Sequence, residues 1–243
     1  METLKATFSS RKDEINKLLT TMVFFEKTET DKAEGVSKFN RFFSDNEGQE
    51  VLSYQELINI LKSNVSLMIY NLIEYTVGNL VDTIYIKIRN EKLSYTEIND
   101  DIKTIWRKIN LKSIKDPSSN HNTIIKKNEE LINAIINKAT IELSYRDTIS
   151  GGNLDGEIIQ KTFSEHGLNV TTSSKNYRPD ILKNIKNYRN ELAHGSVSFV
   201  EALREKSISD ISGYNTITTG FLEELISEVE KYIKDGKYKS AMS

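Results

Sequence analysis

The sequence of 243 residues contains no cysteine, and this absence excludes disulfide bonds, catalytic thiols and zinc sites built on thiolates. Proline occurs only twice, at Pro117 and Pro179, which suits a helical chain because proline interrupts helices. The first residues, METLKATFSSRKDEINK, are charged where a signal peptide needs an apolar stretch. We therefore expect a cytoplasmic protein.

Long hydrophobic runs and an excess of one charge are missing as well. The longest stretch with few charges, residues 65–86, is interrupted by Asn71, Glu74, Asn79 and Asp82, so we expect a buried helix and no contact with a membrane. The net charge of −2 and a pI of about 6.0 provide no overall attraction for a polyanion. Any binding of nucleic acid must therefore come from a local basic patch.

The pattern that is present is helical. Apolar residues recur three or four positions apart along most of the chain, and Ser-x-x-Glu capping boxes begin at Ser53, Ser94 and Ser198. The length and the absence of a clear linker predict one all-α domain over 1–243, a helical bundle in which residues 145–178 form a small insertion between core helices. The expected helices cover residues 8–30, 54–90, 95–109, 123–143, 154–166, 178–194, 199–205 and 209–235, with loops at 43–50 and 115–122.

The helix expected over 178–194 ends in the sequence YRNELAHG and has two distinct sides. An ideal helix turns about 100° per residue, which gives a core-facing stripe of Ile181, Ile185, Tyr188 and Leu192 and an opposite stripe of Lys183, Asn187, Asn190 and His194. Arg189 lies on the border between them, about 7.5 Å along the axis from His194 and roughly 140° around it. The two side chains converge only if Arg189 reaches round the helix or the last turn loosens.

The chemistry of this helix end allows two interpretations. Histidine can transfer protons near neutral pH, so His194 is a candidate functional group. A polar face exposed to water explains Lys183 and Asn187 equally well.

The stretch YRNELAHG resembles the signature of the HEPN superfamily, in which an arginine, often followed by a polar residue, precedes a histidine by four to six intervening residues. Four residues intervene here. The stretches LKSNVSLMIYNLIEYTVGNLVDTIY, SGGNLDGEIIQKTFSEHG and FLEELISEVEKYI are similar to HEPN proteins found beside restriction-modification and other defence genes. Together these similarities extend over about 51–235.

The resemblance implies an all-helical bundle that dimerises so that two Arg and His pairs face one cleft, and in active members a metal-independent endoribonuclease. It assigns Arg189 and His194 to the catalytic positions and Asn190 to the polar position after the arginine. Because RNA supplies its own 2′-hydroxyl nucleophile, His194 would move protons while Arg189 stabilises the phosphorane, and a 2′,3′-cyclic phosphate would remain. Lys183 and Lys186 would neutralise flanking phosphates.

One departure from the family concerns regulation. In the toxin branch that is silenced by nucleotidylation, a tyrosine stands two residues after the histidine, whereas this sequence has Ser196. We therefore do not expect that mode of silencing.

Glu74 is a carboxylate in the middle of the low-charge helix. A lone buried charge is costly unless it is paired. We expect either that Glu74 supports the site as the partner of Arg189 or His194, or that it points outward or pairs with another basic residue.

The remaining histidines give no metal site. His121 lies in a turn-rich segment and is expected in solvent, while His166, just before Gly167, is expected to be a cation at a helix end. The three histidines lack the spacing of metal ligands, so we expect no metal and no other cofactor. Gly151 and Gly152 are expected to form a turn.

Taken together, these features predict a homodimeric endoribonuclease acting on RNA, a toxin or phage-defence effector restrained by an antitoxin or restriction-modification partner. Two alternatives stay open. The chain could be a HEPN-like dimer that recruits such a partner without doing chemistry, or a protein that binds nucleotides or other small ligands in the cleft.

Overall fold

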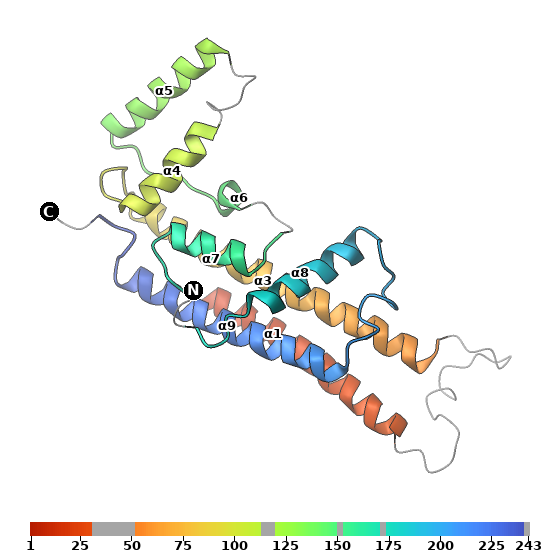
Figure 1. Ribbon diagram of the computed structural model, residues 1–243. Helices are drawn as coiled ribbons and strands as arrows, with labels where there is room; N and C mark the ends of the chain where they lie inside the picture. The colour runs from red at the N-terminus through yellow and green to blue at the C-terminus, as the bar shows by residue number, and fades with distance from the viewer. Residues whose placement is uncertain (31–51, 113–119, 150–152, 171–173, 241–243) are drawn as a thin grey trace. The chain divides into compact units, whose positions relative to one another are not determined.

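The computed structural model of the protein describes residues 1–30, 52–112, 120–149, 153–170 and 174–240. Within these residues the chain forms eight α-helices and no strand beyond two isolated bridges. The predicted all-α fold class is therefore confirmed. The helices are α1 (Glu2–Thr30), α3 (Tyr54–Asn90), α4 (Asp100–Lys112), α5 (His121–Ile136), α6 (Tyr145–Thr148), α7 (Gly156–Glu165), α8 (Pro179–Ala193) and α9 (Ile208–Lys234) (Figure 1).

Helix α3 has the predicted bounds because its start is encoded locally. The Ser53 N–H donates to Glu56 Oε2 at 3.0 Å, and the Glu56 N–H donates to Ser53 Oγ at 3.2 Å. This reciprocal capping box satisfies two backbone donors that a helix start otherwise leaves unpaired. The predicted loops at 43–50 and around Pro117, and the turn at Gly151 and Gly152, lie outside the described residues.

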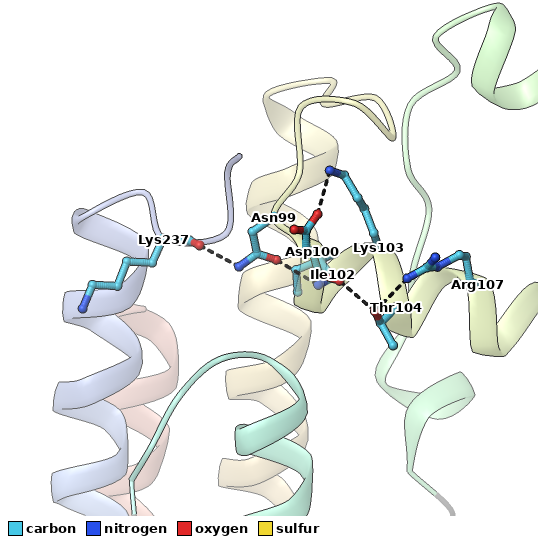
Figure 2. A network of polar contacts seen from close by, with 7 residues as sticks. All are labelled: Asn99, Asp100, Ile102, Lys103, Thr104, Arg107 and Lys237. Carbon is cyan, nitrogen blue, oxygen red and sulfur yellow. Dashed lines mark hydrogen bonds and ion pairs between the residues drawn. The ribbon is translucent and has the colours of Figure 1, made fainter. Parts of the chain in front are cut away.

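Helix α4 begins later than predicted. The capping box at Ser94 does form, with 2.6 Å between Ser94 Oγ and Glu97 Oε2, but it closes a turn. The cap of α4 is Asn99, whose Oδ1 accepts the Ile102 N–H at 2.8 Å while its amide donates to the Lys237 carbonyl at 2.7 Å (Figure 2). The second bond connects residues far apart in sequence, which a local pattern does not reveal.

The helix predicted over 199–205 is wrong, because the structure has turns there. The Ser198 N–H donates to the Glu201 carboxylate as expected, at 3.3 Å. After one bond that spans four residues, from the Ala202 N–H to the Ser198 carbonyl, the next backbone bonds span only three, including Arg204 N–H to the Glu201 carbonyl at 3.1 Å. A short segment ahead of the Ser207 cap of α9 does not recover the cost of starting a helix. The capping box marks a turn as readily as a helix.

The described chain separates into two compact units. One comprises Tyr75–Lys175 and Leu222–Ser243 with Met1, and the other comprises Glu2–Glu74 and Asn176–Phe221. Helices α3 and α9 each contribute residues to both units. The single domain over 1–243 and the insertion at 145–178 stay predictions.

The unit of Glu2–Glu74 and Asn176–Phe221 contains α1, the first part of α3, α8 and the first part of α9. Its core consists of fully buried apolar side chains from each of these helices, among them Ile15, Met22, Val65, Ile69, Ile185 and Ile211. Side-chain hydrogen bonds connect the elements: Asn215 Nδ2 donates to Asn16 Oδ1 at 2.8 Å, and Ser63 Oγ donates to the Phe199 carbonyl at 2.7 Å. The first bond joins α9 to α1, and the second joins α3 to the segment after α8.

The other unit buries the second half of α3, including Val77, Leu80, Val81 and Ile84. The Tyr145 N–H donates to Asp82 Oδ1 at 2.8 Å, and Arg89 Nη1 donates to the Leu143 carbonyl at 2.9 Å. Two side chains of α3 thereby hold the segment that leads into α6. No helix among the described residues is long and apolar enough to cross a membrane.

The prediction for His166 is wrong, because this histidine is buried rather than charged at a helix end. It is 1% exposed, and its Nδ1 lies 2.7 Å from the Thr162 carbonyl oxygen while its Nε2 lies 2.8 Å from Tyr85 Oη. A carbonyl can only accept, so Nδ1 carries a proton, and in the neutral ring Nε2 then accepts from the phenol. Burial lowers the pKa of His166 and therefore favours the neutral ring.

Candidate active site

Helix α8 begins and ends where its sequence directs. Pro179 occupies the first turn, where its missing N–H costs nothing. At the other end His194 is the C-cap, followed by Gly195 with φ +67°. The Gly195 N–H donates to the Leu192 carbonyl at 3.2 Å and the Ser196 N–H to the Glu191 carbonyl at 3.0 Å, which is the Schellman pattern. A glycine-dependent turn therefore fixes the backbone of His194.

The two sides of α8 agree with the predicted wheel for most residues, but Asn190, expected on the exposed side, is half-buried. The buried residues of α8 are Ile181, Leu182, Ile185 and Leu192, and its exposed residues include Lys183, Asn187 and His194. Tyr188, expected in the core, is half-buried, and burial raises the pKa of its phenol. No described residue hydrogen-bonds to the His194 side chain, which is open to solvent.

Arg189 is half-buried and held in place by two neighbours. Its Nη1 donates to Asn190 Oδ1 at 3.0 Å, and its guanidinium carbon lies 5.1 Å from the centroid of the Tyr70 ring on α3. The Tyr70 ring is fully buried, so the cation lies against a rigid aromatic surface that favours it electrostatically. Asn190, predicted as the polar residue after the arginine, thus contacts the guanidinium directly.

Tyr70 is a residue that sequence reasoning missed. A tyrosine at a core-facing position of a long helix is usually explained by packing. The available signal was its place four residues before Glu74, since side chains four apart share one helix face. Glu74 is half-buried, on the α3 face that carries Tyr70. Its pairing with Arg189 or His194 stays a prediction.

The two lysines proposed to bind flanking phosphates differ in exposure. Lys183 is exposed and Lys186 is half-buried. Both precede Arg189 by less than two turns of α8. Their contact with RNA, like the convergence of Arg189 and His194 on one groove, stays a prediction.

A polar cluster beside α8 was also missed. Lys206, in the segment before α9, lies close to Tyr214 of α9 and Tyr188 of α8, and these two phenols, Tyr214 foremost, raise the pKa of its ammonium group. Each of the three residues comes from a different element, so no local pattern connects them. The cluster places the ammonium group of Lys206 beside Tyr188, the residue that precedes Arg189.

Metal ligation has no support in the described part of the chain. No group of three or more His, Asp or Glu side chains there could hold a metal ion. His121 is exposed in the first turn of α5, as its predicted place in solvent requires. Around the predicted site the structure places a half-buried guanidinium, that of Arg189, and an exposed imidazole, that of His194.

A family model described as HEPN_MAE_28990-like HEPN matches residues 1–238. The chain belongs to this HEPN family. No curated protein and no solved structure matches it significantly. The family match extends across nearly the whole chain and confirms membership of the HEPN superfamily, which the sequence around Arg189 and His194 predicted. The assignment of Arg189 and His194 to the superfamily signature stays a prediction.

Proposed function

We propose that this HEPN protein is a metal-independent endoribonuclease. In the proposed reaction His194 takes the proton from the RNA 2′-hydroxyl or supplies one to the leaving 5′-oxygen. Arg189, which is always charged and can bind phosphate with two parallel hydrogen bonds, stabilises the phosphorane. The products are a 2′,3′-cyclic phosphate and a 5′-hydroxyl.

The observation that carries this proposal is the fixed position of Arg189. Electrostatic catalysis requires a charge that is oriented before the reaction begins. Asn190 Oδ1 and the Tyr70 ring provide that orientation, while the Schellman turn holds His194 in solvent at the end of the same helix. Lys183 and Lys186 supply further positive charge along α8 for flanking phosphates.

RNA cleavage by purified protein in EDTA tests the proposal directly. We expect His194→Ala to lower the cleavage rate by about 10²- to 10⁴-fold, and Arg189→Ala by about 10²- to 10³-fold. The matched controls are His121→Ala and Arg146→Ala, which remove an exposed histidine and an exposed arginine elsewhere and should leave the rate unchanged. A wild-type protein that leaves RNA intact in EDTA contradicts the proposal.

The biological setting belongs to the same proposal. We place the protein in the cytoplasm as a homodimeric toxin or phage-defence effector, restrained by an antitoxin or a restriction-modification partner. A homodimer would bring two copies of Arg189 and His194 to one cleft. Analytical ultracentrifugation at micromolar concentration tests this point, and a monomer there counts against the shared cleft.

A second candidate, a binding module without catalysis, is favoured by helix α5. No residue of α5 is buried, and Ile125, Ile132 and Ile136 are 43%, 56% and 69% exposed. Their spacing of seven and four places them on one face. In that case α5 binds a partner protein, and neither the wild-type protein nor the His194→Ala variant cleaves RNA.

A thermal-shift screen with nucleotides tests the third alternative, a protein that binds nucleotides or other small ligands.

A further inference from the structure

A cavity of about 290 Å³ lies in the unit of Glu2–Glu74 and Asn176–Phe221, apart from Arg189. It is bounded by α1, the beginning of α3 and the beginning of α9. Three cationic residues line it, together with the cap of α9 and one described carboxylate. The residues that matter for its chemistry are Lys62, Arg204, Lys206, Ser207, Ile208 and Glu26.

Lys62 is the unusual member of this lining. The residue is 3% exposed, and its Nζ donates to the Lys206 carbonyl oxygen at 2.7 Å. Burial lowers the pKa of Lys62, while the carboxylates of Glu205, Asp210 and Glu26 act in the opposite direction. An ammonium group has three N–H donors, and no other described residue accepts a hydrogen bond from it. Within the described residues, two of these donors at a residue that lines the cavity therefore have no acceptor.

The first turn of α9 adds a further donor. Ser207 caps this helix, and Asp210 Oδ2 accepts from both the Ser207 N–H and its Oγ at 2.8 Å. Ile208 lines the cavity, and its N–H has no acceptor among the described residues, as expected at a helix start. The Asp210 carboxylate bonds to Ser207 and not to the Ile208 N–H. Helix α9 is 27 residues long, so its aligned peptide dipoles present positive charge at this end.

Arg204 completes the positive lining. It is exposed, and its guanidinium forms no ion pair with any described residue, although Glu201 lies near enough to interact electrostatically. Lys62, Arg204 and Lys206 outnumber Glu26 among the described charged residues that line the cavity. The lining of the cavity is therefore mainly cationic, while Glu205 and Asp210 lie close enough to Lys62 to act on it electrostatically.

We propose that this cavity binds a phosphate group. A buried ammonium, a helix-start amide and an exposed guanidinium, each from a different part of the chain, line one cavity, which suits an anion with several acceptor oxygens. One phosphate oxygen would accept hydrogen bonds from Lys62, and a second phosphate oxygen would accept one from the Ile208 N–H. The site is independent of the proposed nuclease chemistry, since neither Arg189 nor His194 lines it.

Two sources of phosphate fit the position of the cavity. Lys62 and Tyr70 are eight residues apart on α3, about 12 Å along the helix axis, and Tyr70 contacts Arg189. A phosphate of the same RNA strand, away from the bond to be cut, could occupy the cavity. A free phosphate compound such as a mononucleotide could occupy it as well.

Calorimetric titration of the full-length protein tests the site with defined probes. The probes are inorganic phosphate, adenosine 5′-monophosphate, adenosine and a short RNA, the RNA being added to protein with the His194→Ala change so that it stays intact. We expect the monophosphate to bind and adenosine not to bind. Lys62→Met, which keeps the length and removes the charge, and Arg204→Gln should each weaken phosphate binding at least about tenfold. Lys17→Gln, an exposed lysine of α1, is the control.

The outcomes separate cleanly. If both variants weaken the RNA as well as the monophosphate, the source is an RNA phosphate, and if they weaken the monophosphate alone, it is a free compound. Arg204→Gln alters an exposed side chain, so it decides the question even where Lys62→Met fails to fold. Equal binding of adenosine and its monophosphate, or unchanged phosphate binding in Arg204→Gln, overturns the site. Loss of cleavage in wild type leaves these titrations unaffected, so the two proposals fail separately.

Discussion

The guanidinium carbon of Arg189 lies 5.1 Å from the centroid of the Tyr70 ring, and this contact joins the signature helix α8 to the core helix α3. The family signature contains the arginine but not the surface that orients it. A fully buried ring gives the cation a fixed platform. In the proposed nuclease, Tyr70 is therefore a positioning residue that acts through Arg189.

Removing the Tyr70 ring should slow RNA cleavage without abolishing it. We expect Tyr70→Leu to lower the single-turnover rate at saturating RNA by about 2- to 30-fold, the range of a cation–π contact. Tyr70→Phe keeps the ring and should restore most of the rate. A purely structural role would lower the melting temperature of Tyr70→Leu and leave the rate per folded molecule unchanged. Equal rates in the Phe and Leu variants would contradict the positioning role.

Glu74 should be coupled to Arg189, because it follows Tyr70 by four residues on the same face of α3. A double-mutant cycle with Glu74→Gln and Arg189→Lys measures this coupling through the free energy of unfolding in urea. We expect the two changes to be non-additive by more than about 0.5 kcal/mol, as for residues in contact. The same cycle with Glu142→Gln, an exposed glutamate elsewhere, should be additive. If the effects of Glu74→Gln and Arg189→Lys on the free energy of unfolding are additive, Glu74 does not belong to the site.

Local signals explain what the sequence predicted well. Ser53 with Glu56 marks the start of α3, while Pro179 and Gly195 bracket α8, and each device acts through backbone groups only a few residues away. The sides of α8 follow from helical periodicity alone. The same local box at Ser198 predicted a helix where turns exist, because its hydrogen bonds form whether or not the residues after Glu201 are helical.

Long-range contacts explain what the sequence did not reveal. His166 was expected to be a cation because it ends a helix, but Tyr85, 81 positions away, covers its Nε2. Tyr70 and Lys62 look like ordinary members of α3 until α8 and the segment before α9 are placed against them. Such roles arise from pairs of elements that no window of one sequence contains.

The need for glycine in the turn after His194 can be tested by changing Gly195 to alanine, with the same change at Gly213 as the comparison. Gly195 has φ +67°, and a Cβ added there meets no atom within 4 Å, so only the backbone opposes a side chain. Gly195→Ala should lower the free energy of unfolding by about 1–2 kcal/mol. Gly213 lies inside α9, where an added Cβ is equally unhindered. Gly213→Ala should raise stability by up to about 1 kcal/mol. Urea unfolding measures both, and a Gly195→Ala protein as stable as wild type would show that the turn tolerates a side chain.

The buried imidazole of His166 should make the protein sensitive to mild acid. Burial lowers its pKa in the folded state, against smaller opposing effects of the Thr162 carbonyl, Glu165 and Asp101, whereas an unfolded histidine titrates at about 6.5. Above that pH both states are neutral at this site and no stability is lost. As the pH falls below it, the unfolded state takes up a proton that the folded state does not. The free energy of unfolding should then decrease by up to about 1.4 kcal/mol per pH unit until the lowered folded pKa is reached.

Urea unfolding between about pH 8 and pH 5 measures this dependence. His166→Gln should be less stable than wild type at pH 8, because Gln cannot reproduce both hydrogen bonds to Thr162 and Tyr85, but its stability should change less between pH 6.5 and 5. His121→Gln, which removes an exposed histidine, should keep the wild-type dependence. Parallel curves for wild type and His166→Gln across that range would mean that His166 takes up its proton in the folded protein as easily as in the unfolded chain, and that the hydrogen bond from Tyr85 does not hold it neutral.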